Sequence, residues 1–334
     1  MHIGKSYGFL EFLIWTRRRA TLLLVNAGLA AGLYLLAGWH WLALPWPVVA
    51  ILGTAASFIV GFKNAQTYAR SVEAQQVWTT ITSLSRYWGL ISRDFPVHAG
   101  AARDLVLRHL AWLTVVRYQL RAPRSWEAAG RAPDVEYRSK AFRVAEHTVP
   151  LAQALSPYVP AAEMDALLAS GNPAGMLIAQ QSQAIRQLYT GQELVPLHHA
   201  EMQKTLKEFL DQHARAERIK NFPYPRQYAI INTVFVWTFA LLLPLGVVRE
   251  FAQIGTAAGW RELMGWLAVP FSTLVAWMYV ALDQVGESTE NPFEGSANDV
   301  PITYICQGIE RESRTLLGEQ GLPEPAGPDN HIVL

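Results

Sequence analysis

Four apolar runs constrain this chain more than any other feature of its sequence. They lie at roughly 20–38, 46–62, 228–248 and 262–282, and a helix needs about 20 residues to cross the hydrocarbon core of a bilayer. Within lipid, a segment must satisfy its own backbone polar groups, so such a run forms a helix. The sequence therefore predicts an all-α membrane protein with four transmembrane helices. Four buried core helices of a soluble protein remain the alternative at this point.

Composition favours a membrane protein that also has a large water-soluble part. Hydrophobic residues make up 51% of the 334 residues and charged residues only 16%, whereas soluble domains carry about 25% charged residues. The net charge of +1 excludes a broad basic field for nucleic acid. The single Cys306 excludes an intrachain disulfide and a cysteine-based zinc site, and we interpret it as a small buried hydrophobe. The first apolar run lacks a clear small-residue cleavage site, so we expect no signal peptide.

Basic residues flank the apolar runs on one side of the predicted membrane. They precede the first run, follow the second and precede the third: Arg17, Arg18, Arg19, Lys63, Arg70, Arg215, Arg218, Lys220 and Arg226. The connection 39–46, WHWLALPW, has no Lys or Arg and is aromatic, as the membrane interface favours. By the positive-inside rule, we expect both termini and the long middle segment in the cytoplasm.

The predicted organisation has five parts. These are a cytosolic segment at 1–19, transmembrane helices 1 and 2 at 20–62, a cytosolic helical region at 63–227, transmembrane helices 3 and 4 at 228–284, and a cytosolic C-terminal segment and tail at 285–334. The middle region is predicted to be helical because apolar residues such as Val77, Ile81 and Leu84 recur at helical spacing. Residues 318–334 are rich in Gly and Pro, so we expect an extended tail that is either loose or strapped to a neighbour.

The sequence offers little that points to catalysis. It has no nucleophile elbow or zinc-protease motif. The adjacent His198 and His199 do not share a helix face as metal ligands would. We therefore predict no enzyme activity, no cofactor and no metal site. An acidic group follows the fourth run, and both a solvated helix end and a cation site remain open for it: Glu287, Glu290, Glu294 and Asp299.

Thr54, Phe58 and Phe62 form a stripe along the second run. Because they are four residues apart, they fall on one line of a helix. By spacing alone, such a stripe fits either helix packing or the lining of a pore. The four helices of one chain do not enclose a path by themselves, so a conduit requires a ring of subunits with one helix of each lining the axis.

Three motifs resemble those of bacterial bestrophins and occur in the expected order. GFKNAQTYARSVEAQQVW (61–78) is similar to the signature that follows the pore helix of that family. ERIKNFPYPRQYAIINTVFVWTFALLLPLGVV (217–248) is similar to the approach to, and body of, the third span. GESTENPFEGSANDVPI (286–302) is similar to the Asn-Pro-Phe loop and the following Asn-Asp-x-Pro. The resemblance covers roughly residues 5–310.

This resemblance implies a pentameric ion channel with a helical cytosolic vestibule. Carried over position by position, the hydrophobic neck falls at Thr54, Phe58 and Phe62, where Thr54 departs from the usual aliphatic residue. The cytosolic aperture falls at Leu197, with His198 and His199 beside it. Lys63 would supply a positive charge at the pore mouth. The calcium clasp of animal members is reduced to a weak remnant at Ser296 and Asp299, so calcium gating is not expected.

The resulting hypothesis is passive conduction of small monovalent ions, with chloride-like anions preferred. The implied partners are four further copies of the chain in a homopentamer, the lipid bilayer and the permeant anions. The implied location is the bacterial inner (plasma) membrane, crossed several times. Two alternatives remain: a cation-selective, sodium-conducting channel of the same type, and a non-conducting membrane scaffold. A membrane enzyme is disfavoured by the missing catalytic residues.

Overall fold

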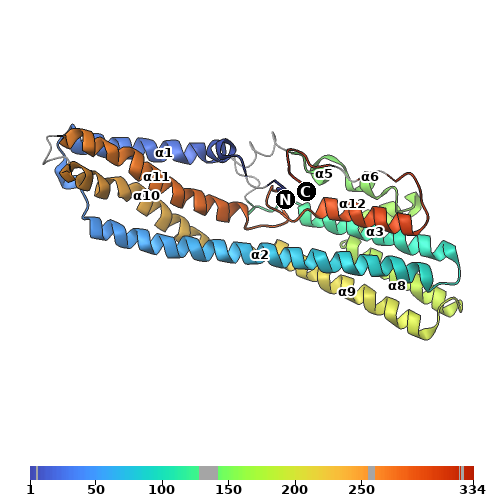
Figure 1. Cartoon of the computed structure of the whole chain (residues 1–334). Helices are drawn as coiled ribbons and strands as arrows, with labels where there is room; N and C mark the ends of the chain where they lie inside the picture. Colours follow the sequence, from blue (N-terminus) through green and yellow to red (C-terminus); the bar gives the residue numbers. More distant parts are fainter. Residues whose placement is uncertain (5–6, 128–141, 255–259, 323, 325–326) are drawn as a thin grey trace. The chain divides into compact units, whose positions relative to one another are not determined.

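Helices dominate the regular structure of the chain (Figure 1). The computed structural model describes residues 1–4, 7–127, 142–254, 260–322, 324 and 327–334, and within these ranges the only β-structure is two isolated bridges. The chain divides into two compact units. Unit 1 comprises Met1–Gly4, Arg70–Phe222 and Asn291–Leu334, and unit 2 comprises Lys5–Ala69 and Pro223–Glu290. The all-α fold predicted from the sequence is confirmed.

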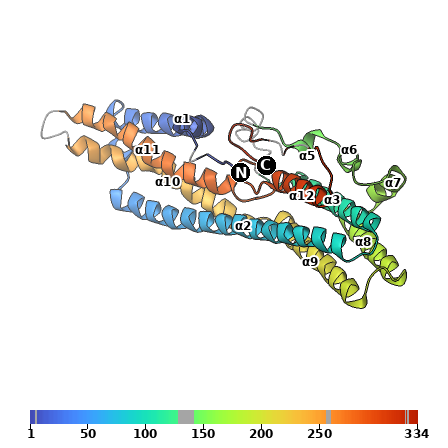
Figure 2. The ribbon, with the colours of Figure 1, turned by 45° about the vertical axis from the view of Figure 1, so that its right-hand side comes forward.

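Unit 2 contains the four apolar runs. Its helices are α1 (Phe9–Leu35), the short 3-10 helix η1 (His40–Leu42), the first part of α2 (Trp46–Asp94), α10 (Arg226–Ile254) and α11 (Arg261–Ser288). In both views α1, α10 and α11 run side by side, with the first part of α2 along them (Figures 1 and 2). The loop predicted to connect the first two runs is the segment that contains η1.

Three of the described helices, α2, α10 and α11, are long and apolar enough to cross a membrane. The first predicted span, 20–38, overlaps the C-terminal part of α1, which begins at Phe9 and ends at Leu35. The arginine cluster 17–19 lies within this helix, and the apolar part beyond it includes Asn26. The Asn26 amide donates a hydrogen bond to the Leu241 carbonyl of α10 at 3.1 Å. Length and composition therefore support three of the four predicted spans directly.

Small residues contribute to the interior of unit 2. Ala56, Ala240 and Ala276 are buried in one apolar cluster, and glycines allow still closer approach between helices. A Cβ added at Gly246 would lie 2.7 Å from Val49 Cγ2, so α2 and α10 meet there at close range. Small residues at helix contacts are typical of membrane proteins, where packing rather than the hydrophobic effect drives association.

Unit 1 is built from the remaining helices (Figures 1 and 2). They are the second part of α2, α3 (Ala99–Arg121), α5 (Ala145–Thr148), α6 (Leu151–Leu155), α7 (Ala161–Ala169), α8 (Pro173–Thr190), α9 (Pro196–Asn221) and α12 (Ile302–Leu316). The helical character predicted for the middle region is confirmed. Residues 122–127, which follow α3, are non-helical.

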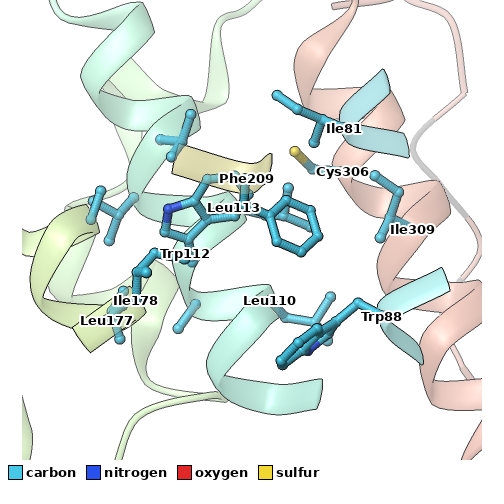
Figure 3. Close-up of a cluster of buried hydrophobic side chains, with 14 of the residues drawn as sticks. Ile81, Trp88, Leu110, Trp112, Leu113, Leu177, Ile178, Phe209, Cys306 and Ile309 are labelled. Carbon is cyan, nitrogen blue, oxygen red and sulfur yellow. The ribbon is translucent and has the colours of Figure 1, made fainter. Parts of the chain in front are cut away.

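Large aromatic side chains lie among aliphatic ones in the core of unit 1 (Figure 3). Trp88, Trp112 and Phe209 are fully buried, and the rings of Trp112 and Phe209 lie 5.1 Å apart. Cys306 of α12 is also buried in this core. Burial raises the pKa of its thiol to about 12, so the thiol stays protonated and unreactive at neutral pH. The interpretation of Cys306 as a small hydrophobe is confirmed.

The end of the chain is held by its beginning. Asn330 and His331 have positive φ angles of 49° and 63° and form a tight turn. The following residues pair antiparallel with residues 1–3, through Val333 N to the Met1 carbonyl at 2.9 Å and Ile3 N to the His331 carbonyl at 2.8 Å. Of the two expectations for the tail, a strapped segment is observed, and the strap holds it to its own chain within unit 1.

Candidate functional site

The stripe predicted on the second run forms an exposed face of α2. Phe58 is 66% exposed and Phe62 is 69% exposed, and Thr54 is exposed on the same line of the helix. Two large phenyl rings left uncovered in a unit with an apolar exterior have to meet lipid, another copy of the chain or an internal path. The Thr54 hydroxyl donates a hydrogen bond to the Ala50 carbonyl at 3.0 Å, so part of its polarity is used within its own helix.

A groove of about 1050 Å³ runs beside this stripe within unit 2. Residues of α2, α10 and α11 line it, and most of them are apolar, including Phe239 and Phe271. The Ser57 and Tyr279 hydroxyls lie 2.6 Å apart, and Tyr279 also donates to the Gly53 carbonyl at 3.3 Å. Because these hydroxyls satisfy one another, the groove offers surface for packing rather than groups for acid–base chemistry.

Lys63 does not lie on the exposed face. Its side chain is 2% exposed, and its Nζ lies 2.6 Å from Asp283 Oδ1 of α11. Successive helix residues point about 100° apart, so the position after Phe62 falls on the buried side of α2. The prediction that Lys63 supplies a positive charge at a pore mouth is therefore corrected: its charge is buried and neutralised by a carboxylate.

Asp283 and Asn232 belong to this polar centre, and the sequence pattern did not single out the aspartate. Asp283 is fully buried, and the Asn232 amide of α10 donates a hydrogen bond to its Oδ1. One signal was available in the sequence, because a carboxylate at the end of an apolar run is costly unless it has a partner. The spacing gave no indication of which cation pairs with it.

Leu197 lies at the start of α9 in unit 1 and is 77% exposed. The neighbouring imidazoles are both engaged with aromatic rings. His198 stacks on Phe95 with ring centroids 3.9 Å apart, and His199 lies 4.7 Å from the Tyr189 ring. The structure thus places an exposed leucine beside two histidines that are held in place by packing.

Most of the acidic group after the fourth run is buried, so it is not a solvated helix end. Glu290, Glu294 and Asp299 are buried, and among the described residues no cluster of His, Cys, Asp and Glu could hold a metal ion. Glu287 pairs with Arg19 at 2.9 Å, and Glu290 pairs with Arg226 at 3.1 Å. Glu287 and Glu290 therefore form ion pairs within the chain.

Asp299 shows how the predicted clasp remnant is used. Its Oδ2 accepts hydrogen bonds from the backbone of Gly295 and Ser296 at 2.7 and 3.0 Å, and its Oδ1 accepts one from the Ser296 hydroxyl at 2.6 Å. The buried Arg121 guanidinium lies 3.3 Å from Oδ2. A cation is thus already present beside this carboxylate, and it belongs to the protein.

These features define an all-α membrane protein whose apolar helices carry an exposed aromatic stripe. The profile of the family described as Bacterial/Fungal Bestrophin protein matches residues 16–315. Because the match spans most of the chain, this protein belongs to the bacterial and fungal bestrophin family, as the three motifs indicated.

Individual relatives support the same placement. The voltage-dependent anion channel-forming protein YneE of Escherichia coli (strain K12) is 24% identical over 286 residues, which is 85% of this chain and 81% of the relative. A protein of the same description from Mesorhizobium japonicum is 22% identical over 269 residues, covering 80% and 74%. These relatives are named as channel-forming proteins and not as enzymes, which confirms the expectation on that point.

A solved structure shows the same fold. A bacterial bestrophin homologue from Klebsiella pneumoniae superposes with a TM-score of 0.75 at 22% sequence identity, covering 90% of this chain and 98% of that chain. At this level of identity the likeness establishes the fold, and the roles of individual residues have to be argued from the side chains of this chain.

Proposed function

We propose that this protein is an ion channel that conducts small monovalent ions passively, with chloride-like anions preferred. Five copies surround one axial pore, and the first part of α2 from each copy lines its neck. Rings of Thr54, Phe58 and Phe62 form the neck in this proposal. A second constriction at the cytosolic exit is formed by Leu197.

The exposed aromatic stripe carries this proposal. Phe58 and Phe62 are more than half exposed in the single chain, and they belong to a helix long and apolar enough to cross a membrane. Relatives matched over most of the chain are named as anion channel-forming proteins. A stripe that faces an axis of symmetry remains uncovered in one subunit and becomes a set of stacked rings in the assembly.

The neck acts through the hydration of the ion. Phenyl rings offer no full charge to replace water, and an ion stripped in apolar surroundings pays tens of kcal/mol by Born estimates. The neck therefore conducts when it is wide enough for a hydrated ion and closes by dewetting when it narrows. Thr54 makes the outermost ring less apolar than an aliphatic residue would, but its hydroxyl proton is already donated to Ala50.

The preference for anions rests on the relatives and on the aromatic edges. Lys63 no longer supports it, since its charge is paired with Asp283. The edge of a phenyl ring carries partial positive charge and its face partial negative charge. Rings of Phe58 and Phe62 that turn their edges to the axis favour an anion over a cation. A neck that presents ring faces would favour sodium instead.

The proposed arrangement in the membrane follows the flanking charges. The protein crosses the bacterial inner membrane several times, with both termini in the cytoplasm. The five predicted parts keep their bounds of 1–19, 20–62, 63–227, 228–284 and 285–334 in this proposal. Unit 1, with its aromatic core, is compatible with a water-soluble vestibule wall because its largest apolar side chains are buried.

Purified protein reconstituted in planar lipid bilayers tests the proposal. Under a chloride gradient, we expect currents whose reversal potential follows chloride. The double variant Phe58→Ala, Phe62→Ala removes the dewetting barrier, so its current at a given protein density should increase by about tenfold or more. Leu29→Ala is the matched control, because Leu29 is 62% exposed on α1 and lies outside the stripe.

The outcomes separate the alternatives. A reversal potential that follows sodium rejects the anion preference and retains the channel. An absence of current in both the wild type and the double phenylalanine variant rejects the channel and favours a non-conducting scaffold. Oligomer mass in detergent is an independent check, because a stable monomer contradicts an axial pore.

A further inference from the structure

The buried side of α2 carries a polar centre directly behind the aromatic stripe. Lys63 is the residue after Phe62, yet it is 2% exposed where Phe62 is 69% exposed. The residues that share its side of the helix are buried as well, among them Val60 and Thr67. Any rotation of α2 about its axis therefore moves Lys63 and the phenylalanines together.

Three helices of unit 2 meet at Lys63. Its Nζ lies 2.6 Å from Asp283 Oδ1 and 3.4 Å from the Asp283 carbonyl oxygen, both on α11. The Asn232 amide of α10 donates to the same Oδ1. Asn232 is 1% exposed and Asp283 is 0% exposed, so water does not screen these contacts.

The carboxylate depends on Lys63. Neither Asp283 Oδ2 nor Asn232 Oδ1 has a hydrogen-bond partner among the described residues. A buried carboxylate with unfilled acceptor sites is strongly destabilised when its cationic partner is removed. The pair is therefore a directional contact that holds only while α2 keeps its rotation and its register along α11.

Side chains of α2 lie against the backbone of α11 at the same place. A Cβ added at Gly286 of α11 would lie 2.6 Å from Asn64 Oδ1 and 3.4 Å from Lys63 Cε. The Asn64 amide also donates to the Leu282 carbonyl at 3.3 Å. This close approach leaves no room for α2 to turn without breaking polar contacts.

We infer that the Lys63–Asp283 pair is a positioning element that fixes the rotation of α2 and thereby the presentation of Phe58 and Phe62. The effect on conduction rests on the proposed function, since the orientation of Phe58 and Phe62 governs conduction only in a channel. Its structural part, the fixed rotation of α2, stands independently. Lys63 acts here through the phenylalanines and touches no permeant ion.

Nitroxide labels on α2 measure the rotation without relying on current. Single cysteines are placed at Gly61, where an added side chain meets open space, and at the buried Val60. The native Cys306 is buried with a raised pKa and gives no background labelling. In the reconstituted protein with the native pair, we expect a mobile label at 61 and an immobile label at 60.

The decisive variant replaces both charges, Lys63→Met with Asp283→Leu, because it leaves no unpaired buried charge. We expect it to reduce the contrast in mobility between the two labels by about threefold or more and to change the current per protein by about fivefold, as loss of a coupling of this kind allows. Unchanged contrast and current overturn the inference. The matched control is Arg19→Met with Glu287→Leu, which removes an ion pair between α1 and α11.

The exchanged pair, Lys63→Asp with Asp283→Lys, keeps the inference testable if the apolar variant does not assemble. Because the attraction is kept, we expect its contrast and current to stay within about twofold of the wild type. An exchanged protein that assembles but loses the contrast overturns the inference. If the wild type carries no current at all, the proposed function fails while the labels still report whether the pair fixes α2.

Discussion

The two units of this protein differ in the side chains that they bury and expose. In unit 1 the largest side chains are inside, with Trp78, Trp88 and Trp112 all at 0% exposure. In unit 2 the buried set includes alanines such as Ala56 and Ala240 beside larger side chains such as Phe239. Other large apolar side chains of this unit, such as Phe58 and Leu29, are exposed. The two units have similar needs for cohesion but reach it with different side chains.

The difference reflects the surroundings that each unit is built for. In water, burying a large apolar side chain is the main source of stability. In lipid, an exposed leucine costs nothing, so helices associate by close packing of small residues. The two units thus differ because one is built for water and the other for lipid. Substitutions of the same chemical kind in each unit test this difference.

Truncating an aromatic side chain should give the largest difference in unfolding free energy between the two units. Trp112→Ala in unit 1 leaves a cavity in the core and should cost about 3–5 kcal/mol of unfolding free energy. Phe58→Ala in unit 2 removes an exposed ring and should cost about 0.5 kcal/mol or less. Denaturant titration of the full-length protein in detergent measures both. Equal losses would show that the stripe is packed rather than open.

Adding a methyl group to a glycine should sharpen the comparison within unit 2. Gly246→Ala places a Cβ 2.7 Å from Val49 Cγ2, and overpacking of this kind costs about 1–3 kcal/mol. Gly61→Ala, where nothing lies within 4 Å, should stabilise the helix by about 0.5–1 kcal/mol. Thermal unfolding of the two variants beside the wild type checks the opposite signs. A Gly246→Ala protein that unfolds at the same temperature as the wild type, or higher, would contradict the close contact of α2 with α10.

The core of unit 1 should respond to acid through His109. Burial lowers the pKa of this imidazole from 6.5 to about 3. Between these values the unfolded chain binds a proton that the folded chain does not, so stability falls as the pH falls below 6.5. From pH 6.5 to 5 the loss should be about 1.5 kcal/mol smaller in His109→Leu than in the wild type.

A second histidine, His213, also contributes to the loss of stability at low pH. Burial also lowers the pKa of His213, although nearby Glu217 opposes the shift. His213 thus adds a loss of the same sign, which both proteins share when His109 alone is changed. Identical pH profiles for the wild type and His109→Leu would show that His109 is protonated in the folded state.

The smallest effect is expected from calcium. Asp299 is already held by Arg121 and by backbone amides, so it has no need of a further cation. Addition of about 1 mM calcium, or of a chelator, should shift the unfolding temperature by less than about 1 °C. A clear rise in Tm with calcium would mean that the ion displaces the guanidinium.

Much of the fold could be predicted from local pattern. The apolar runs and the 3.6-residue spacing identified the helices, because both are properties of neighbouring residues. The helix that contains the first apolar run extends beyond it, since it starts before the arginine cluster and ends at Leu35. The alignment of Phe58 and Phe62 on one face follows from the same spacing, and the structure adds that both side chains are exposed.

The polar partners could not be predicted, because they depend on distant parts of the chain. In the sequence, Lys63 was interpreted as a free charge next to an apolar run. Its partner Asp283 is 220 residues away in sequence. The same holds for Arg121 and Asp299, which are separated by 178 residues. The sequence alone therefore determined the helical class, the apolar character and the stripe on α2. Only the tertiary structure decided which charges are buried in pairs, because burial and pairing arise when distant helices pack against one another.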